Sequence, residues 1–428
     1  MREAGVDGSE VGRIIESYGN PGNNYLPLNG QVIDLNEYPH LFDSIPGAFY
    51  PSDSILPDLT GFEIHFIYFI PTNKNIGLAL VNSVNNSKEY YIYTTIDGGV
   101  TWVDQNVSPR VYSLNVNGTV IQWIPYLKTF VIATYAENFN TFLYFYNFNA
   151  ETNVLTFSGS VNTGSSTQIY CITDIVDDPS RNRFLIIGSN SNSYSGNDIM
   201  IKSVPYSTYK NASTYVGLFS LHLTGVGDNR GYIVNDRLLL YGVGNKTSSS
   251  KKTSYNIYIL SLIDNSEITS TYFSFESDNP NSISSNFQGH QRPIKYNNKY
   301  YLFTTITNML VAFTIDESLS TISHKDITLD GIPNVDKMTP QVMVGEYFYI
   351  FQPGMTIRLH HQYLDGLSNK ISIVRNTSLN IRYIYMYRYE LYPEYFQNGD
   401  FIAMRYKTLS IRGVNSLPNE LNKWVKGA

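Results

Sequence analysis

The sequence contains little charge and almost no cysteine. Lys, Arg, Asp and Glu make up 15% of the 428 residues and leave a formal net charge of -6, whereas charged residues form about 25% of an average soluble protein. Because no basic stripe is present to neutralise phosphates, nucleic-acid binding is excluded as the main function. Cys171 is the only cysteine, which excludes a disulfide framework and thiolate metal sites.

Long apolar runs are missing as well. The longest apolar stretches, such as residues 66–70, are far too short to span a bilayer. Residues 1–12 are polar and hold no apolar core of the length that a signal peptide needs. We therefore expect a soluble, acidic protein with no membrane insertion and no secretion signal.

Aromatic residues are abundant, with 36 Tyr and 22 Phe. Short runs of alternating Tyr, Ile, Phe and Val recur between clusters of Asn, Gly, Ser and Asp, and this pattern predicts an all-β protein. Helical periodicity is confined to two short segments, residues 35–45 and the tail at 418–425. The tail, which we separate as residues 413–428, is thus predicted to form a short helix.

From residue 62 onward a unit of roughly fifty to sixty residues recurs, which is the spacing of propeller blades. Each unit has a polar turn followed by a strongly apolar second strand, and it ends in a hairpin with an acidic residue or Asn. The pattern predicts a six- to seven-bladed β-propeller over residues 62–412, in which residues 383–411 form either a seventh blade or closing strands. The second strands are expected at 77–81, 129–133, 183–187, 237–241, 300–304 and 347–351.

The first unit carries a sharper motif, formed by Thr95, Asp97, Gly99, Thr101 and Trp102. It resembles the Asp-box of sialidases and many other propellers. The carboxylate is expected to accept backbone N–H groups inside the hairpin, while the glycines permit positive φ and the indole packs beneath. We interpret all five residues as structural. Weaker forms of the motif lie at 147–154, 264–268, 316–322 and 365–371.

Residues 1–61 form a separate, turn-rich module. Its four blocks are 12–15, 25–31, 38–42 and 56–61, and their order and spacing resemble the phage tail collar family. The resemblance implies a small α+β docking module, although Thr60 stands where that family usually has Arg. The residues that carry the resemblance, all interpreted as structural, are Asn29, Gly30, Gln31, Tyr38, Pro39, Pro57, Asp58 and Gly61.

No catalytic or metal-binding constellation is recognisable in the sequence. The Phe/Tyr-Arg-Ile-Pro segment of sialidases is absent, as are nucleophile-elbow, phosphate-loop and His-Glu-x-x-His motifs. Strand alternation would point His360 and His361 to opposite faces, so we predict no metal and no cofactor. The acidic residues that a glycosidase could use are interpreted as turn or surface residues, and we predict no enzymatic activity. They are Asp174, Asp177, Asp178 and Glu346.

A collar-like module joined to an Asp-box propeller resembles a bacteriophage tail component. The leading hypothesis is a tail fibre or receptor-binding protein that docks through residues 1–61 and recognises host cell-surface glycan through the propeller. Asn, Ser, Thr and Tyr suit glycan recognition because they offer hydrogen bonds and flat apolar faces. The resemblance implies contacts with other phage tail proteins, a homotrimer, and a virion protein assembled in the host cytoplasm. The alternatives are a structural tail or baseplate protein without a ligand and a surface-polysaccharide glycoside hydrolase.

Overall fold

The computed structural model describes most of residues 62–375 and seven short segments outside this range. Those segments are 14–17, 25–27, 32–33, 49–51, 388–390, 409–411 and 422–426. Between 62 and 375 the structure does not describe 71–72, 84–85, 98–100, 113–118, 136–140, 165–168, 191–197, 223–225, 245–251, 277–291, 307–308, 328–340, 345, 353–354 and 368–370.

The chain forms two compact units. The larger unit comprises Asp58–Pro340 and Tyr383–Tyr392, and the smaller comprises Met1–Pro57, Gln341–Arg382 and Pro393–Ala428. The domain boundaries expected at residues 61 and 412 stay predictions. Among the described residues, no helix has the length and apolar character needed to cross a membrane.

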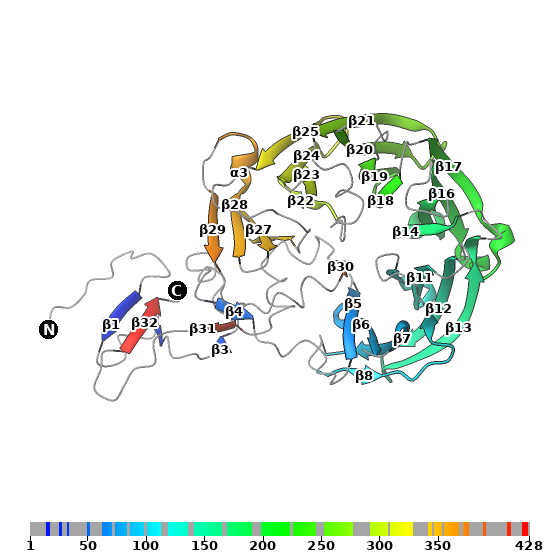
Figure 1. The fold of residues 1–428 in the computed structure, drawn as a ribbon, viewed down its shortest axis with the longest axis horizontal. Coiled ribbons are helices and arrows are strands. Elements are labelled where there is room, and N and C mark those ends of the chain that lie inside the picture. Colours follow the sequence, from blue (N-terminus) through cyan, green and yellow to red (C-terminus); the bar gives the residue numbers. More distant parts are fainter. Residues whose placement is uncertain are drawn as a thin grey trace. The chain divides into compact units, whose positions relative to one another are not determined.

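The larger unit is built from successive sheets, in each of which strands that follow one another in the chain pair antiparallel (Figure 1). The first consists of β5 (Phe62–Ile70), β6 (Asn73–Ser83), β7 (Asn86–Thr95) and β8 (Val103–Asp104), with β9 (Val111–Tyr112) also paired to β7. The second consists of β10 (Val120–Ile124), β11 (Thr129–Tyr135), β12 (Thr141–Asn149) and β13 (Val154–Asn162). The third consists of β14 (Cys171–Asp178), β15 (Arg183–Ser189), β16 (Asp198–Pro205) and β17 (Val216–His222).

Two further sheets complete this series. The fourth consists of β18 (Val226–Val234), β19 (Arg237–Gly244), β20 (Lys252–Ser261) and β21 (Glu267–Glu276). The fifth consists of β22 (Ile294–Tyr296), β23 (Lys299–Ile306), β24 (Met309–Asp316) and β25 (Ile322–Ile327). Repeated four-stranded meanders of this kind are propeller blades, so the predicted all-β propeller fold is confirmed.

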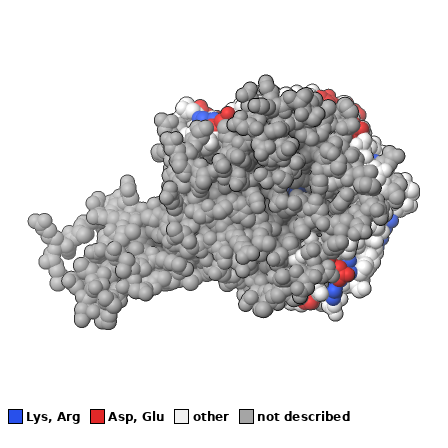
Figure 2. Space-filling view, in the orientation of Figure 1, with Lys and Arg blue, Asp and Glu red and all other residues white. Residues whose placement is uncertain are grey.

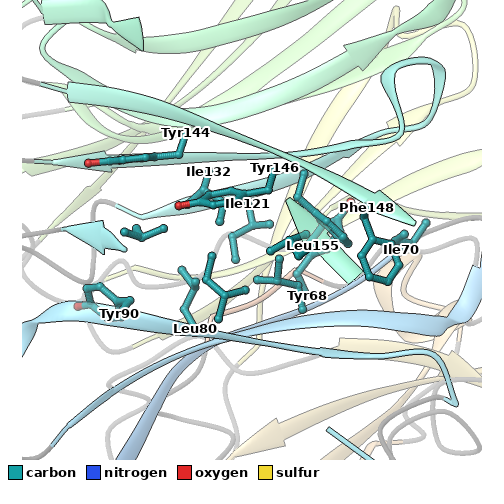
Figure 3. Close-up of a cluster of buried hydrophobic side chains, with 14 of the residues drawn as sticks. Tyr68, Ile70, Leu80, Tyr90, Ile121, Ile132, Tyr144, Tyr146, Phe148 and Leu155 are labelled. Carbon is teal, nitrogen blue, oxygen red and sulfur yellow. The ribbon is translucent and has the colours of Figure 1, made fainter. Parts of the chain in front are cut away.

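The second strand of each sheet is buried on both faces, which explains its continuous apolar run. In β11, Phe130 and Ile132 pack against the first sheet, whereas Val131 and Ala133 pack against the third. Figure 3 shows the first of these layers, with side chains from β5–β7 facing side chains from β10–β13. All six predicted second strands are observed, in β6, β11, β15, β19, β23 and β27.

The inner strands of neighbouring sheets approach closely. Gly231 of β18 faces Ile187 and Val176 of the third sheet, and a Cβ at this position would lie 2.5 Å from Cδ1 of Ile187. Tight spacing at the centre of the unit therefore requires a residue without a side chain.

Asparagine closes the turns that lead into the second strands. Asn182, Asn235, Asn297 and Asn298 have φ values of 50°, 54°, 46° and 58°. Asn tolerates this left-handed region better than other non-glycine residues. The abundance of Asn in polar turns is thus a backbone requirement of the repeated hairpin.

The smaller unit contains a four-stranded antiparallel sheet of the same order. It consists of β26 (Gln341–Val344), β27 (Tyr347–Gln352), β28 (Met355–His360) and β29 (Ile371–Arg375), and α3 (His361–Leu364) follows β28. The unit also contains two three-stranded sheets, β1-β32-β2 and β3-β31-β4. Their strands are β1 (Ile14–Ser17), β2 (Tyr25–Pro27), β3 (Val32–Ile33), β4 (Phe49–Pro51), β31 (Leu409–Ile411) and β32 (Asn422–Lys426).

Part of the C-terminal tail differs from the prediction. Residues 422–426, expected to be helical, form β32, which pairs with both β1 and β2. The short apolar pattern suits either a helix or a strand. The segment is a strand because β1 and β2 supply hydrogen-bond partners for its backbone. The helix expected at 35–45 lies outside the described residues.

The segment at 383–411 contributes closing strands within the part that the structure describes. Strand β30 (Arg388–Glu390) adds to the first sheet by pairing in parallel with β5, and β31 pairs with β3 and β4. Of the two alternatives left open for this segment, its described strands therefore fit closure of existing sheets and not a four-stranded blade.

Candidate functional site

The hairpin between β7 and β8 is closed by the carboxylate of Asp97. The backbone N–H of Thr101 donates to its two oxygens at 3.0 and 3.1 Å, and the hydroxyls of Thr95 and Thr101 each donate at 2.7 Å. Trp102 meets Phe69 edge-on, with ring centroids 6.0 Å apart. Gly99 lies outside the described residues. Both carboxylate oxygens of Asp97 therefore accept hydrogen bonds from its own hairpin.

The weaker forms of this motif occupy the equivalent connection, between the third and fourth strands, in other sheets. Asp316 accepts the backbone N–H groups of Ser320 and Thr321 at 2.6 and 2.7 Å. Desolvation raises the pKa of Asp316, but these bonds and those from the Ser318 and Ser320 hydroxyls together lower it to about 2. Asn149 accepts from the N–H of Glu151 in the second sheet. The repeated acid or Asn thus stabilises turns.

The residues that carry the collar resemblance lie outside the described part of the chain, so their roles stay predictions. They are Asn29, Gly30, Gln31, Tyr38, Pro39, Pro57, Asp58 and Gly61.

Two of the acidic residues interpreted as turn or surface groups are buried. Asp174 and Asp178 are 0% and 1% exposed in β14, which corrects the interpretation. Asp178 accepts from Nε of Arg183 at 2.8 Å and from Nη1 of Arg181 at 3.1 Å. Glu346, by contrast, has a side chain that is 66% exposed. The buried carboxylates are tolerated because arginines from nearby turns and neighbouring sheets neutralise them.

The carboxylate of Asp174 joins three sheets at their inner strands. Arg292, just before β22, donates from Nη1 to Oδ2 at 2.6 Å and from Nη2 to Oδ1 at 2.9 Å. Arg230 of β18 donates to Oδ1 at 3.4 Å, and the N–H groups of Gly231 and Ile175 donate at 2.8 and 2.9 Å. No side chain of this cluster is more than 5% exposed. Buried ion pairs and hydrogen bonds of Asp174 therefore link the inner strands of three sheets.

An exposed aromatic ring stands at the border between the second and third sheets. Tyr126 lies in the 3-10 turn η4 (Pro125–Leu127), which Lys128 closes with φ 49°. Its side chain is 71% exposed and stacks on Tyr206 at a centroid distance of 5.0 Å and an angle of 15°. One face of the Tyr126 ring is thus supported from below by a buried ring.

The supporting ring is itself fixed. Tyr206 begins η7 (Tyr206–Thr208), and its N–H donates to the carbonyl oxygen of Asn182 at 3.0 Å. Its hydroxyl donates to the carboxylate of Asp177. Burial raises the pKa of Asp177 to about 6, with the nearby charge of Asp178 adding to the effect. A carboxyl group with a raised pKa therefore lies beside the hydroxyl of the supporting ring.

The β16–β17 connection, which begins with Tyr206, carries a second tyrosine and a lysine. Tyr209 meets Phe145 edge-on at 4.8 Å, and the ammonium group of Lys210 lies 5.3 Å from the Tyr209 centroid. Lys210 also donates to the Ser158 hydroxyl of β13 at 2.5 Å. The turn η8 (Ala212–Thr214) follows and is capped by Asn211, whose side chain accepts from the N–H of Ser213. We call Tyr126, Tyr206, Asp177, Tyr209 and Lys210 the tyrosine platform.

This platform combines features of a binding site for polar ligands. It offers a flat apolar ring face with a hydroxyl at its edge, a cation, and a carboxyl group that can donate or accept. Perturbed carboxyl groups cluster at functional sites, although structural networks perturb them too. Charged residues make up 15% of the chain, and Figure 2 shows blue and red side chains next to each other at the upper left and the lower right of the view. The platform would therefore act through ring contacts and hydrogen bonds and not through a large charged field.

The two adjacent histidines do not follow strand alternation. Strand β28 ends at His360 and α3 begins at His361, so the backbone changes direction between them. Their rings stack with centroids 4.8 Å apart at 27°. The expectation that they point to opposite faces is wrong, because alternation applies only while the strand continues.

Sequence reasoning did not single out Tyr126, Arg230 or any ligand-binding residue. A signal for Tyr126 exists, because an aromatic residue after Pro125 stands where the other units have polar turns. No comparable signal exists for Arg230 and Arg292, which lie 56 and 118 residues from Asp174. Cys171, the single cysteine, is buried in β14.

No family model and no curated protein sequence matches the chain. Similar solved structures include the β-propeller domain of the Trilobed protease from Pyrococcus furiosus, at 10% identity and TM-score 0.41, covering 74% of this chain and 84% of that one. A lectin from Aleuria aurantia in complex with Fucα1-6GlcNAc has 10% identity and TM-score 0.38, with 74% and 97% covered. The polysaccharide lyase Uly1 has 8% identity and TM-score 0.40, with 74% and 78% covered. Similarity at this level carries no argument about ligand or activity.

Proposed function

We propose that the chain is a bacteriophage tail fibre or receptor-binding protein whose propeller recognises a glycan on the host surface. The observation that carries the glycan part is the stacked pair of Tyr126 and Tyr206, in which an exposed ring is backed by a buried one. A ring held in this way loses little conformational freedom on binding, and it can contact the apolar face of a sugar ring.

Several neighbouring groups support a sugar ligand. Asp177 can accept a hydrogen bond when ionised and donate one when protonated, and Lys210 offers further donors. Sugars present hydroxyl groups around an apolar ring face, so a site for them needs both kinds of contact. The low overall charge of the chain, 15% of residues, favours a neutral or weakly charged glycan over a polyanion.

The tail-docking part rests on the order and spacing of the collar-like blocks in residues 12–61. The same resemblance supports a homotrimer that docks on other tail proteins in a virion assembled in the host cytoplasm. Light scattering of the purified chain measures the oligomer directly, and a monomer would count against docking of the collar type. Antibody labelling of particles in electron microscopy would locate the chain at the distal, exposed end of the tail.

Binding to extracted bacterial surface polysaccharides tests the glycan part. We expect Tyr126→Ala to weaken the binding of the full chain on the order of tenfold or more, because an aromatic anchor is worth about 1.4–2 kcal/mol. Tyr272→Ala is the matched control, since that side chain is similarly exposed, at 66%, on β21. Both variants should keep the wild-type unfolding midpoint.

The outcomes separate the alternatives. Equal binding by the Tyr126→Ala and Tyr272→Ala variants would remove the tyrosine platform from the proposal. Failure of the wild-type chain to bind any polysaccharide from a permissive host, together with an internal position in the particle, would favour a structural tail or baseplate protein. Release of reducing ends from the polysaccharide would establish the hydrolase alternative. Loss of that release in Asp177→Asn would assign the acid.

A further inference from the structure

Three side chains with metal-ligand chemistry converge at one end of the sheet β26–β29. Glu346 lies at the turn between β26 and β27, His360 ends β28, and His361 begins α3. Each offers a ligand atom, and these three atoms lie within 4.8 Å of one another. The cluster belongs to the smaller unit, so it is separate from the tyrosine platform and independent of the proposed function.

The backbone holds the three residues together. Tyr347 pairs with His360 across β27 and β28, and the N–H of His361 donates to the carbonyl oxygen of Glu346 at 2.9 Å. The His360 side chain is only 6% exposed, whereas that of Glu346 is 66% exposed. His360 is thus held in the interior, whereas the exposed side chain of Glu346 can rotate toward it.

We propose that Glu346, His360 and His361 bind a zinc-type divalent cation, with water as the fourth ligand. The distance from Nε2 of His360 to Oε2 of Glu346 is 3.3 Å, which is long for a charge-assisted hydrogen bond. In a tetrahedral zinc site each ligand atom lies about 2.0 Å from the metal, so two ligand atoms are about 3.3 Å apart. The separation of Nε2 and Oε2 matches this value. Two imidazoles and one carboxylate select zinc-type ions over magnesium.

Metal binding through Nε2 of His360 would break a hydrogen bond at the start of α3. Nδ1 of His360 accepts the N–H of Gln362 at 3.2 Å and so caps α3. When Nε2 coordinates a metal, the neutral ring carries its proton on Nδ1, which then faces another donor. Metal binding therefore replaces the cap, and the cation links the β26–β27 turn to the start of α3.

Titration calorimetry of the untagged full chain with ZnCl₂ tests the site. We expect one Zn²⁺ per chain, with a higher melting temperature in its presence and no comparable response to MgCl₂. The variants Glu346→Gln and His361→Asn should each weaken Zn²⁺ binding on the order of tenfold or more. Both change side chains that are not fully buried, so circular dichroism should match wild type.

Glu151→Gln provides the matched control, because Glu151 is an exposed acidic residue in the turn between β12 and β13. It should bind Zn²⁺ as wild type does. The proposal is overturned if millimolar ZnCl₂ produces no saturable binding, or if Glu346→Gln and His361→Asn bind Zn²⁺ with wild-type affinity. It is also overturned if MgCl₂ competes on equal terms. A failed glycan assay leaves these outcomes unaffected.

Discussion

Replacing Asp174 by Asn removes the carboxylate that joins the inner strands of three sheets. The change preserves side-chain volume, so its effect reports charge and hydrogen bonding and not a cavity. The side chains of Arg230 and Arg292 are 2% and 4% exposed and would lose the negative charge that both contact. Removing one partner of a buried ion pair costs about 3–5 kcal/mol of unfolding free energy, because a buried charge loses its compensation.

Urea unfolding followed by tryptophan fluorescence measures this loss, since Trp102 and Trp123 both lie in the larger unit. With a slope of about 3 kcal/mol/M, the midpoint should fall by about 1–2 M. The control is Glu317→Gln, which breaks the Lys295–Glu317 pair of 2.7 Å between side chains 43% and 47% exposed. Exposed pairs contribute about 0–1 kcal/mol, so its midpoint should scarcely move.

A double variant sharpens the test. Asp174→Asn combined with Arg292→Gln should cost less than the sum of the two single changes, because the second change removes one of the charges that the first leaves uncompensated. A midpoint shift for Asp174→Asn no larger than that for Glu317→Gln would refute this role of Asp174, as would additive effects of Asp174→Asn and Arg292→Gln.

Two further predictions concern other acidic residues. Asp97→Ala should lower the unfolding free energy by about 1–2 kcal/mol, because the carboxylate accepts several hydrogen bonds within its hairpin; a urea midpoint equal to that of the wild type would contradict this. Asp177 has a pKa raised by burial from 3.8 to about 6, so the folded state binds its proton more tightly than the unfolded chain. The stability that it contributes is fully present below about pH 3.8 and is lost as pH rises through about 6. Relative to Asp177→Asn, the wild type should therefore gain at most about 3 kcal/mol between pH 7 and pH 4, measured by urea unfolding at each pH, and a difference that does not change with pH would refute the assignment.

The strand pattern was predictable because both causes of it are local. A second strand packed between two sheets is apolar on both faces. Phe130 and Val131 are therefore consecutive apolar residues, although Phe130 packs against the first sheet and Val131 against the third. The turns before these strands need left-handed backbone, and Asn182 and Asn235 supply it. The local sequence pattern therefore predicts the blades and the apolar residues of their second strands.

Predictions failed where a residue's environment is set by distant segments. The tail at 422–426 has a short apolar pattern that suits helix or strand, and pairing with strands near residues 14 and 26 decides for strand. The two histidines were assigned to opposite faces because alternation was assumed to continue past His360, where the strand in fact ends. Local periodicity holds only within an element, and its end is set by tertiary contacts.

Local sequence predicts the all-β propeller class, the second strands, the Asn-closed turns and the hairpin acid of the first sheet, because each of these depends on residues close in the chain. Which polar groups contact one another depends instead on tertiary packing. Asp174 and Arg292 are 118 residues apart in the chain, yet Nη1 of Arg292 lies 2.6 Å from Oδ2 of Asp174. The exposed ring of Tyr126 is supported because Tyr206 of the next sheet stacks against it. Packing of successive sheets creates these neighbours, and no spacing within a single unit encodes them.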